Sequence, residues 1–208
     1  MNKRLSVAIT GGIGSGKSLV LNILKEWGYS TFSCDEIYKE LSFNKDYLEK
    51  LKAVFPCAVN DLGELNREAL SQVVFNNKNE LKKLNALAHP LVFQNLRKKI
   101  DDANGVVFSE VPLLFESGAE KDFDYVIIVN RDKDKRILAV SQRDFLSKEK
   151  VENRILSQFN YEKKLKKFLN NEKFFILENN GDIDGVKVEI KKIIDKIMQY
   201  ETFIVKRL

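Results

Sequence analysis

A glycine-rich segment near the N-terminus constrains this chain more than any other part of it. Residues 11–18 read Gly-Gly-Ile-Gly-Ser-Gly-Lys-Ser, after the apolar run 5–9 and before the helical pattern 19–27. This is the G-x-x-x-x-G-K-[ST] pattern of a phosphate-binding loop between a strand and a helix. Because glycine has no Cβ, such a loop can bring its backbone close to phosphate groups. The segment therefore predicts a site for a nucleoside triphosphate.

The residues of this loop have distinct expected roles. The N-terminal end of the following helix carries a partial positive charge, which favours bound phosphate. Lys17 is expected to reach the β- and γ-phosphates, and the Ser18 hydroxyl is expected to hold Mg²⁺. We expect nucleotide contacts from Gly12, Ile13, Gly14, Ser15, Gly16, Lys17, Ser18 and Leu19. The alternative is a glycine-rich turn that happens to precede a Lys-Ser pair.

The composition narrows the class of protein. The chain has 208 residues, 44% of them apolar, which suits one domain with a substantial core and an insertion. The net charge is +5, but the 35 basic residues are interspersed with 30 acidic ones, which disfavours a nucleic-acid partner. Cys34 and Cys57 form no zinc or disulfide pattern, and their sparseness suits a reducing compartment. No membrane span or signal peptide is visible, so we expect a cytoplasmic protein without a membrane partner.

Apolar runs and helical patterns alternate along the chain. Five runs have the character of strands, at residues 5–9, 29–33, 105–111, 125–129 and 174–177. Helical patterns cover residues 132–145 and 147–159, with Gly28 ending the first helix, Ser147 capping a later one and an apolar stripe from Val186 to Ile197 in the last. The alternation predicts an α/β fold with a parallel five-stranded sheet wound with helices on both faces.

Residues 34–103 depart from this alternation. Their helical pattern is interrupted at Pro56 and Gly63, and Pro90 is expected to end a helix before another begins at Leu91. An insertion of about 70 residues is longer than ordinary α/β connections. It is placed to hold a second substrate.

Further motifs point to one family of phosphate-loop proteins. Asp35 follows the second strand run, residues 84–90 read Leu-Asn-Ala-Leu-Ala-His-Pro, and residues 110–116 read Glu-Val-Pro-Leu-Leu-Phe-Glu. With the loop, residues 142–144 and residues 179–181, these motifs are collinear over nearly the whole chain. In this combination the sequence resembles the dephospho-coenzyme A kinase family. The resemblance implies a P-loop kinase fold with ATP and Mg²⁺ as cofactors, and phosphorylation of the ribose 3′-hydroxyl of dephospho-coenzyme A, the last step of coenzyme A synthesis.

The resemblance also implies how the chain is organised. Residues 1–208 form a single domain with a nucleotide-binding core at 1–33 and 104–208, a helical substrate-binding insertion at 34–103 and a lid at 132–167. In the lid, Arg143 and Arg154 are expected to neutralise charge on ATP and on the transferring phosphoryl group. Ala139 stands where the family commonly has arginine, and lysines 163, 164, 166 and 167 are expected on a solvated helix face.

Two acids are candidates for the chemical step. Asp35 aligns with the second acid of the family's Asp-x-Asp motif and is expected to orient the ribose hydroxyl and accept its proton. The alternative is that Asp35 caps the next helix. Glu110 ends a strand next to the loop, where it can bind Mg²⁺ directly or through water, or accept a hydrogen bond from Ser18. A structural role for Glu110 stays open.

The resemblance places further residues on the side of the acceptor substrate. Pro112, Leu113 and Leu114 are expected to meet its adenine or pantetheine portion, and Glu116 to position ribose hydroxyls. His89 is expected near the substrate, the alternative being a hydrogen-bonded histidine that ends a helix before Pro90. Arg67 can pair with a substrate phosphate through its guanidinium, or be a surface cation.

Three competing functions remain. A nucleoside or nucleoside monophosphate kinase has the same architecture, and a panel of acceptors with ATP would separate it. A P-loop nucleotide switch is disfavoured because the chain lacks an Asn/Thr-Lys-x-Asp guanine-reading signature and carries the insertion. Nucleic-acid binding rests only on the pI of about 9.0. We expect a monomer or a weak homo-oligomer with dephospho-coenzyme A as its small-molecule substrate.

Overall fold

The structure is a computed structural model that describes residues 4–75, 77–158, 161, 168 and 171–205. The chain forms two compact units, which we name the core unit (Met1–Thr31 and Asn104–Leu208) and the insertion unit (Phe32–Ala103). The predicted boundaries of the insertion are residues 34 and 103. The predicted end of the lid at residue 167 and the four lysines from 163 to 167 lie outside the described residues.

Within the described residues, five strands form one sheet in the order β2-β3-β1-β4-β5. They are β1 (Leu5–Thr10), β2 (Ser30–Ser33), β3 (Val106–Glu110), β4 (Tyr125–Asn130) and β5 (Phe174–Glu178). β1 is parallel to both β3 and β4, and β4 is parallel to β5. The predicted α/β fold and parallel sheet are confirmed. Because parallel strands end at the same edge, the segments that follow β1, β3, β4 and β5 meet there.

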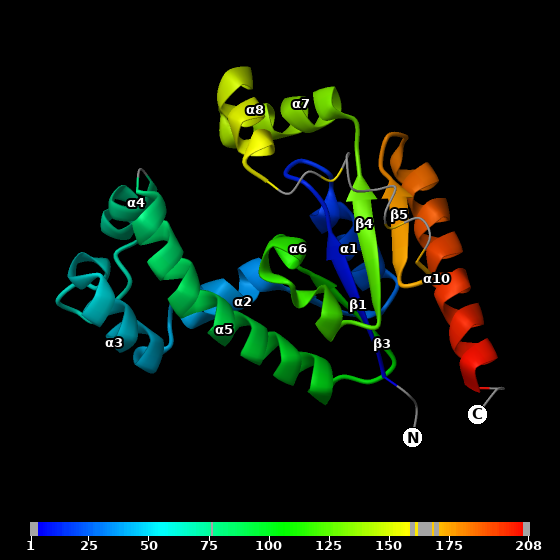
Figure 1. Cartoon of the computed structure of the whole chain (residues 1–208), viewed down its shortest axis with the longest axis horizontal. Coiled ribbons are helices and arrows are strands. Elements are labelled where there is room, and N and C mark those ends of the chain that lie inside the picture. Colours follow the sequence, from blue (N-terminus) through cyan, green and yellow to red (C-terminus); the bar gives the residue numbers. More distant parts are fainter. Residues whose placement is uncertain (1–3, 76, 159–160, 162–167, 169–170, 206–208) are drawn as a thin grey trace. The chain divides into compact units, whose positions relative to one another are not determined.

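Two helices of the core unit bury one face of the sheet. α1 (Lys17–Glu26) and α10 (Ile183–Val205) share a hydrophobic cluster with side chains of four strands. Figure 1 shows α10 lying along β5. The predicted stripe of the last helix is its buried face, formed by Val186, Ile190, Ile193, Ile194 and Ile197. Gly28, at φ 85°, follows the end of α1 as predicted.

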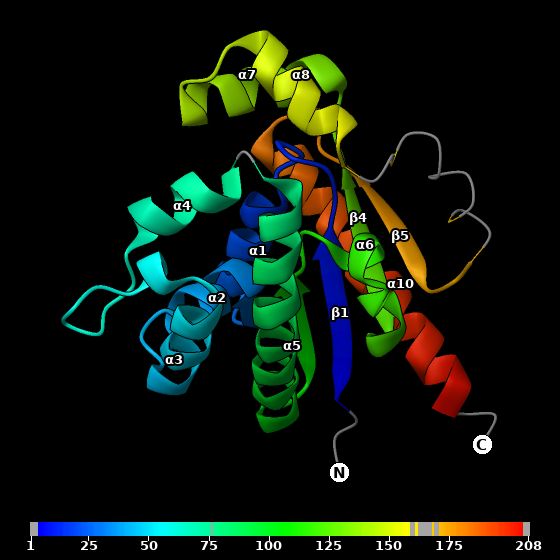
Figure 2. The ribbon, with the colours of Figure 1, turned by 60° about the vertical axis from the view of Figure 1, so that its left-hand side comes forward.

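The remaining helices of the core unit follow the carboxyl ends of strands. α6 (Leu114–Ser117) and the 3₁₀ helix η2 (Ala119–Asp122) come after β3, and α7 (Lys133–Asp144) and α8 (Lys148–Leu156) come after β4. Figures 1 and 2 show α7 and α8 beyond the arrowheads of β1 and β4. Ser147 caps α8 by accepting a hydrogen bond from the Lys150 amide, as predicted. α8 ends at Leu156, and the predicted end at residue 159 lies outside the described residues.

The insertion unit is helical, and one long helix organises it. Its elements are α2 (Cys34–Leu41), α3 (Lys45–Val54), the 3₁₀ helix η1 (Pro56–Ala58), α4 (Arg67–Phe75) and α5 (Lys78–Asp102). α2, α3 and α4 all contact α5, the long helix that stands upright in Figure 2. Among the helices of the described ranges, including α5, none combines the length and apolarity needed to cross a membrane.

The predicted helix break at Pro90 is wrong, because α5 runs through it without interruption. A proline inside a helix removes one backbone hydrogen bond and costs about 3 kcal/mol. The buried stripe of α5 continues on both sides of Pro90 at every fourth position, and its members are Leu84, Ala88, Val92, Leu96 and Ile100. Burial of this stripe offsets the loss, while Pro90 itself lies on the exposed side.

Candidate active site

The phosphate loop has a backbone that favours glycine at several positions. Gly11, Gly14 and Gly16 have φ values of 149°, 75° and 96°. A Cβ on Gly11 would overlap the carbonyl oxygen of Val129 on β4, and a Cβ on Gly14 would lie 2.7 Å from the Arg136 carbonyl oxygen. Both neighbours are backbone atoms, so they cannot swing away. The glycines therefore fit the loop into the carboxyl edge of the sheet as well as shaping it.

Lys17 and Ser18 lie at the start of α1, directly after this loop. The Lys17 ammonium group donates hydrogen bonds to the carbonyl oxygens of Gly11 and Gly12, at 3.1 and 3.3 Å. The Ser18 hydroxyl donates to Glu110 Oε1 at 3.2 Å. Glu110, at the end of β3, is 6% exposed. The structure thus brings the Ser18 hydroxyl and the Glu110 carboxylate together beside the loop.

A hydroxyl and a carboxylate oxygen are hard donors, which suit Mg²⁺. In the chain as described, no group of three or more His, Cys, Asp and Glu side chains is placed to hold a metal ion. Magnesium in phosphoryl-transfer sites is commonly bound by one or two protein groups together with substrate phosphates. Ser18 and Glu110 fit such a site.

An arginine that the sequence interpretation missed lies against the loop. Arg136, on α7, is 5% exposed, and its Nε donates to the carbonyl oxygen of Ile13 at 3.0 Å. Its guanidinium lies so close to Gly12 that a Cβ there would overlap it. The signal that could have found Arg136 is its position: on a helix it shares a face with Ile137 and Val140, which are buried.

Two side-chain amides also bind the loop, and neither was predicted. Asn179 follows β5, is 5% exposed, and donates from Nδ2 to the Ser15 carbonyl oxygen at 2.7 Å. Gln158 follows α8, and its Oε1 accepts a hydrogen bond from the Ile13 amide at 2.7 Å. The Ile13 amide, which we expected to face the nucleotide, is therefore bound to a side chain of the segment that follows α8.

The two predicted lid arginines share one carboxylate. Arg143 donates to both oxygens of Asp144, at 2.7 and 3.1 Å, and Arg154 donates to Asp144 Oδ2 at 3.2 Å. The hydrogen bonds from Arg143, with the charge of Arg154, lower the pKa of Asp144 below its usual value. Arg143 is exposed, so its guanidinium is open to solvent on one side. The ion pairs keep both arginines on the same side of the α7–α8 turn.

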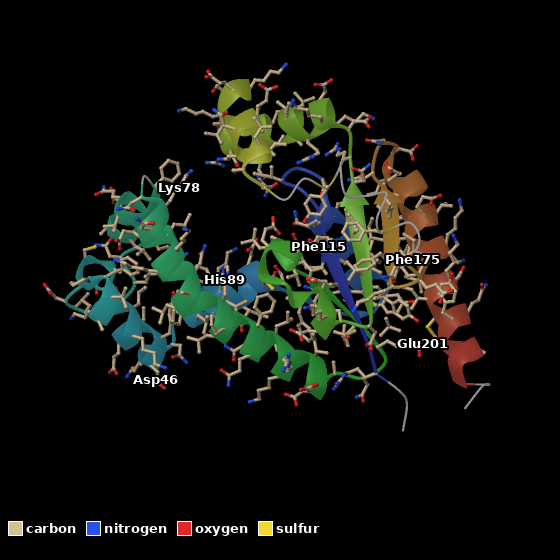
Figure 3. The ribbon with its side chains drawn as sticks, in the orientation of Figure 1. Asp46, Lys78, His89, Phe115, Phe175 and Glu201 are labelled. Carbon is tan, nitrogen blue, oxygen red and sulfur yellow. The ribbon has the colours of Figure 1, made fainter. Side chains whose placement is uncertain are left out.

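The segment 112–116 divides into buried and exposed residues. Leu114 is fully buried, so its side chain belongs to the core, whereas Leu113 is 37% exposed and Glu116 is exposed. Pro112 is partly buried. Phe115, labelled on α6 in Figure 3, stacks on Phe168 with ring centroids 4.7 Å apart. The exposed members are the ones that remain available to a substrate.

Tyr161 joins this aromatic group to the phosphate loop. Its ring lies edge-on to Phe115 at 6.0 Å, and its hydroxyl lies 3.1 Å from Thr10 Oγ1 at the end of β1. Burial raises the pKa of Tyr161 to about 12, so the phenol is protonated at neutral pH. The hydroxyl is therefore a neutral hydrogen-bonding group next to the loop.

The insertion unit carries the other predicted residues. Asp35 lies exposed in the first turn of α2, whose capping position is Ser33, so the alternative that Asp35 caps this helix is wrong. Arg67 begins α4, is exposed, and donates from Nη2 to Ser42 Oγ at 3.0 Å. His89 lies midway along α5 (Figure 3), so it does not end a helix. Partial burial lowers the pKa of His89, which is therefore neutral at pH 7.

Comparison with known proteins decides the family. The model of the dephospho-CoA kinase family matches residues 5–184. The chain belongs to the dephospho-CoA kinase family. A dephospho-CoA kinase of Fusobacterium nucleatum is 33% identical over 195 residues, covering 92% of this chain and 97% of the relative. One of Thermus thermophilus is 35% identical over 192 residues, covering 92% and 91%.

Solved structures agree with this assignment. A crystal structure of a Thermus thermophilus protein has a TM-score of 0.76 at 35% identity and covers 93% of this chain and 97% of its own. Dephospho-CoA kinase from Campylobacter jejuni has a TM-score of 0.68 at 30% identity, covering 96% and 100%. A shikimate kinase from Acinetobacter baumannii, at 12% identity and a TM-score of 0.51, shares the fold alone. The P-loop kinase architecture of the family is therefore present in this chain.

Proposed function

We propose that the protein transfers the γ-phosphoryl group of ATP to the 3′-hydroxyl of the ribose of dephospho-CoA, giving CoA and ADP. The observation that carries this proposal is the family match over residues 5–184. The loop, Lys17 and the Ser18–Glu110 pair supply the groups that the donor side of such a transfer needs.

On the donor side, the loop amides and Lys17 hold the phosphates, and the helix dipole of α1 adds to the attraction. Ser18 and Glu110 would hold Mg²⁺, and the ion would supply positive charge beside the β- and γ-phosphates. Arg143 and Arg154 approach from the lid and stabilise the charge that spreads over the phosphoryl oxygens. Because Asp144 pairs with both arginines, it sets where they point.

On the acceptor side, Asp35 accepts a hydrogen bond from the ribose 3′-hydroxyl and takes its proton as the oxygen–phosphorus bond forms. The bond from the γ-phosphorus to the bridging oxygen of ADP breaks in the same step, and ADP leaves with that electron pair. The exposure of Asp35 in the first turn of α2 supports this role, because a buried carboxylate could not reach a substrate.

Several residues are assigned to the acceptor, Arg67 and His89 in the insertion unit and Pro112, Leu113 and Glu116 in the core unit. Arg67 pairs with a phosphate of dephospho-CoA, and His89, neutral at pH 7, offers a hydrogen bond. Pro112 and Leu113 meet the adenine or pantetheine portion, and Glu116 binds ribose hydroxyls. Leu114 takes part only through its backbone, since its side chain is fully buried.

The proposal also covers the compartment, the partners and the oligomeric state of the protein. The two cysteines are not joined in a disulfide, which suits a reducing cytoplasm. We assign no nucleic-acid or membrane partner, because basic and acidic residues are interspersed along the chain. We expect the enzyme to act as a monomer or a weak homo-oligomer.

A panel of acceptors tests the proposal. Purified protein is incubated with ATP, Mg²⁺ and either dephospho-CoA, AMP, CMP, UMP or adenosine, and ADP formation is followed. We expect kcat/KM for dephospho-CoA to exceed that for every other acceptor by more than about a hundredfold, because the other acceptors would leave hydrogen-bonding groups of the site unpaired. Preference for a nucleoside monophosphate would instead support the competing kinase. ATP binding without transfer to any acceptor would support a nucleotide switch.

A further inference from the structure

We propose that Arg136 and Gln158 are positioning residues that fasten the tip of the phosphate loop to the helix pair α7–α8. We name Arg136, Gln158 and Ile13 the tip clamp. The proposal goes beyond the assigned reaction by giving a role to two side chains outside the loop motif. It relies on the proposed function only in taking ATP as the ligand of the loop.

Both backbone groups of Ile13 are held by side chains. Its amide donates to Gln158 Oε1 at 2.7 Å, and its carbonyl oxygen accepts from Arg136 Nε at 3.0 Å. The two bonds join residues that are 145 and 123 positions apart in the chain. A residue whose peptide groups are fixed on both sides cannot rotate about its own backbone without breaking one of these bonds.

The Ile13 side chain provides a third attachment. It packs against a small hydrophobic cluster formed by Ile137 and Val140 of α7 and Val151 of α8. These three residues are 5% exposed or less. The tip of the loop therefore packs against the hydrophobic cluster of the α7–α8 pair through a partly buried side chain.

Neighbouring contacts strengthen the same junction. Arg131, which precedes α7, donates from Nη1 to the Gly14 carbonyl oxygen at 3.4 Å. The backbone of Arg136 lies so close to Gly14 that a Cβ there would be 2.7 Å from its carbonyl oxygen. The Ser15 amide donates to the Gly12 carbonyl oxygen at 3.1 Å, which closes a turn around Ile13 and Gly14. The orientation of Ile13 therefore sets the direction in which the Gly14 and Gly16 amides point. The clamp thus determines how well the loop is arranged for a triphosphate.

The test measures the effect of the two hydrogen bonds to Ile13 separately from the effects of side-chain packing and charge. Gln158→Met keeps the length of the side chain and removes the acceptor, and Arg136→Lys keeps the charge and removes the Nε donor. Asn153→Met, at an exposed amide of α8, is the matched control. We would measure the Kd for ATP by calorimetry, the KM for each substrate, kcat and the thermal midpoint.

We expect each single variant to weaken ATP binding by about tenfold, with the KM for dephospho-CoA and kcat changed by less than about threefold. The control should match the wild type. The double variant should weaken ATP binding by clearly less than the product of the single effects, because both bonds hold one residue.

Two results would overturn the clamp. One is an ATP Kd within twofold of the wild type in both single variants, even if their thermal midpoints fall, since the bonds would then serve stability only. The other is a double variant whose effect equals the product of the singles. If Arg136→Lys does not fold, Gln158→Met alone decides between the outcomes. Failure of the wild type itself to bind ATP would count against the proposed function and is distinguishable from both.

Discussion

The phosphate loop of the core unit and the predicted acceptor residues of the insertion unit are built in different ways. The loop is held through its backbone, by glycines with no room for a Cβ, by Asn179 and by the tip clamp. Asp35 and Arg67 instead stand exposed on helices whose packing uses other residues. The difference teaches that the nucleotide side depends on backbone shape, whereas the acceptor side depends on exposed side chains. Substitutions should therefore damage stability and ATP binding in the first region, and turnover or acceptor binding without loss of stability in the second.

The largest effect is expected at Asp35. Asp35→Asn should lower kcat by about 10²- to 10⁴-fold, because the amide cannot accept the proton of the ribose hydroxyl. The ATP Kd and the thermal midpoint should stay at wild-type values, since the side chain is exposed. Steady-state kinetics and calorimetry check both statements. Glu36→Gln, at the adjacent exposed acid, is the control, and near-normal turnover of Asp35→Asn would remove Asp35 as the base.

Gly11 and Gly63 give a matched pair across the two regions. Both have positive φ values, but a Cβ on Gly11 would overlap the Val129 carbonyl oxygen, whereas nothing lies within 4 Å of a Cβ on Gly63. Gly63→Ala should lower the free energy of unfolding by about 1 kcal/mol from backbone strain alone. Gly11→Ala should lower it by about 3 kcal/mol, because overlap adds to strain.

Urea unfolding of both alanine variants measures this difference. Gly11→Ala should also weaken ATP binding, while Gly63→Ala should leave it unchanged. Equal losses of stability in the two variants would contradict the view that the loop is fitted tightly into the sheet edge.

A smaller effect is expected at Glu110. Glu110→Gln removes the charge beside Ser18 and should raise the Mg²⁺ concentration needed for half-maximal activity by about 10- to 100-fold. The KM for dephospho-CoA should not change. Glu116→Gln is the complementary variant, since it should alter the KM for dephospho-CoA and leave the Mg²⁺ requirement alone. A Glu110→Gln enzyme with the Mg²⁺ requirement of the wild type would leave Glu110 with a structural role.

The smallest effect is expected at Asp144, and it depends on pH. Hydrogen bonds from Arg143 lower the pKa of this carboxyl, so its stabilising effect is present above the ordinary Asp pKa of about 3.9 and is lost as the pH falls through the lower, folded-state pKa. Asp144→Asn should cost less than about 1 kcal/mol at pH 7, because the ion pairs are largely solvent-exposed. Urea unfolding from pH 7 down to pH 3 should show the difference between variant and wild type shrinking. Asp195→Asn, at an exposed acid of α10, is the control, and a difference that grew at low pH would contradict this explanation.

Much of the fold was predictable because it follows from local pattern. The apolar runs that became β1, β3, β4 and β5 are short and bounded by loop residues, as buried parallel strands are. The continuity of α5 was not predictable from Pro90, which locally favours a break. It required the knowledge that the stripe from Leu84 to Ile100 is buried along its whole length. Tertiary packing overrode a local preference there.

The candidate site also contains residues that the sequence predicts and residues that it does not. The loop glycines, Lys17 and Ser18 form a contiguous motif whose spacing is set by the shape of a bound phosphate. Arg136, Gln158 and Asn179 were missed because each reaches the loop from more than a hundred positions away. Their contacts depend on how far the ends of β4 and β5 lie from the loop in space. A single sequence does not give that distance. The apolar face shared by Arg136, Ile137 and Val140 hinted at Arg136. Asn179 lay in one of the motifs that resemble the family, but that motif gave it no role.

The order of the strands has a consequence for how the protein is made. β1 and the loop leave the ribosome before β3 and β4, yet β1 lies between these two strands, whose residues follow about a hundred positions later. The amide of Asn179, which binds Ser15 across 164 positions, is synthesised later still. A nascent chain released before that residue would lack a finished cradle for ATP. Translation must therefore run past Asn179 before the loop, made more than 160 residues earlier, acquires the ability to hold a nucleotide.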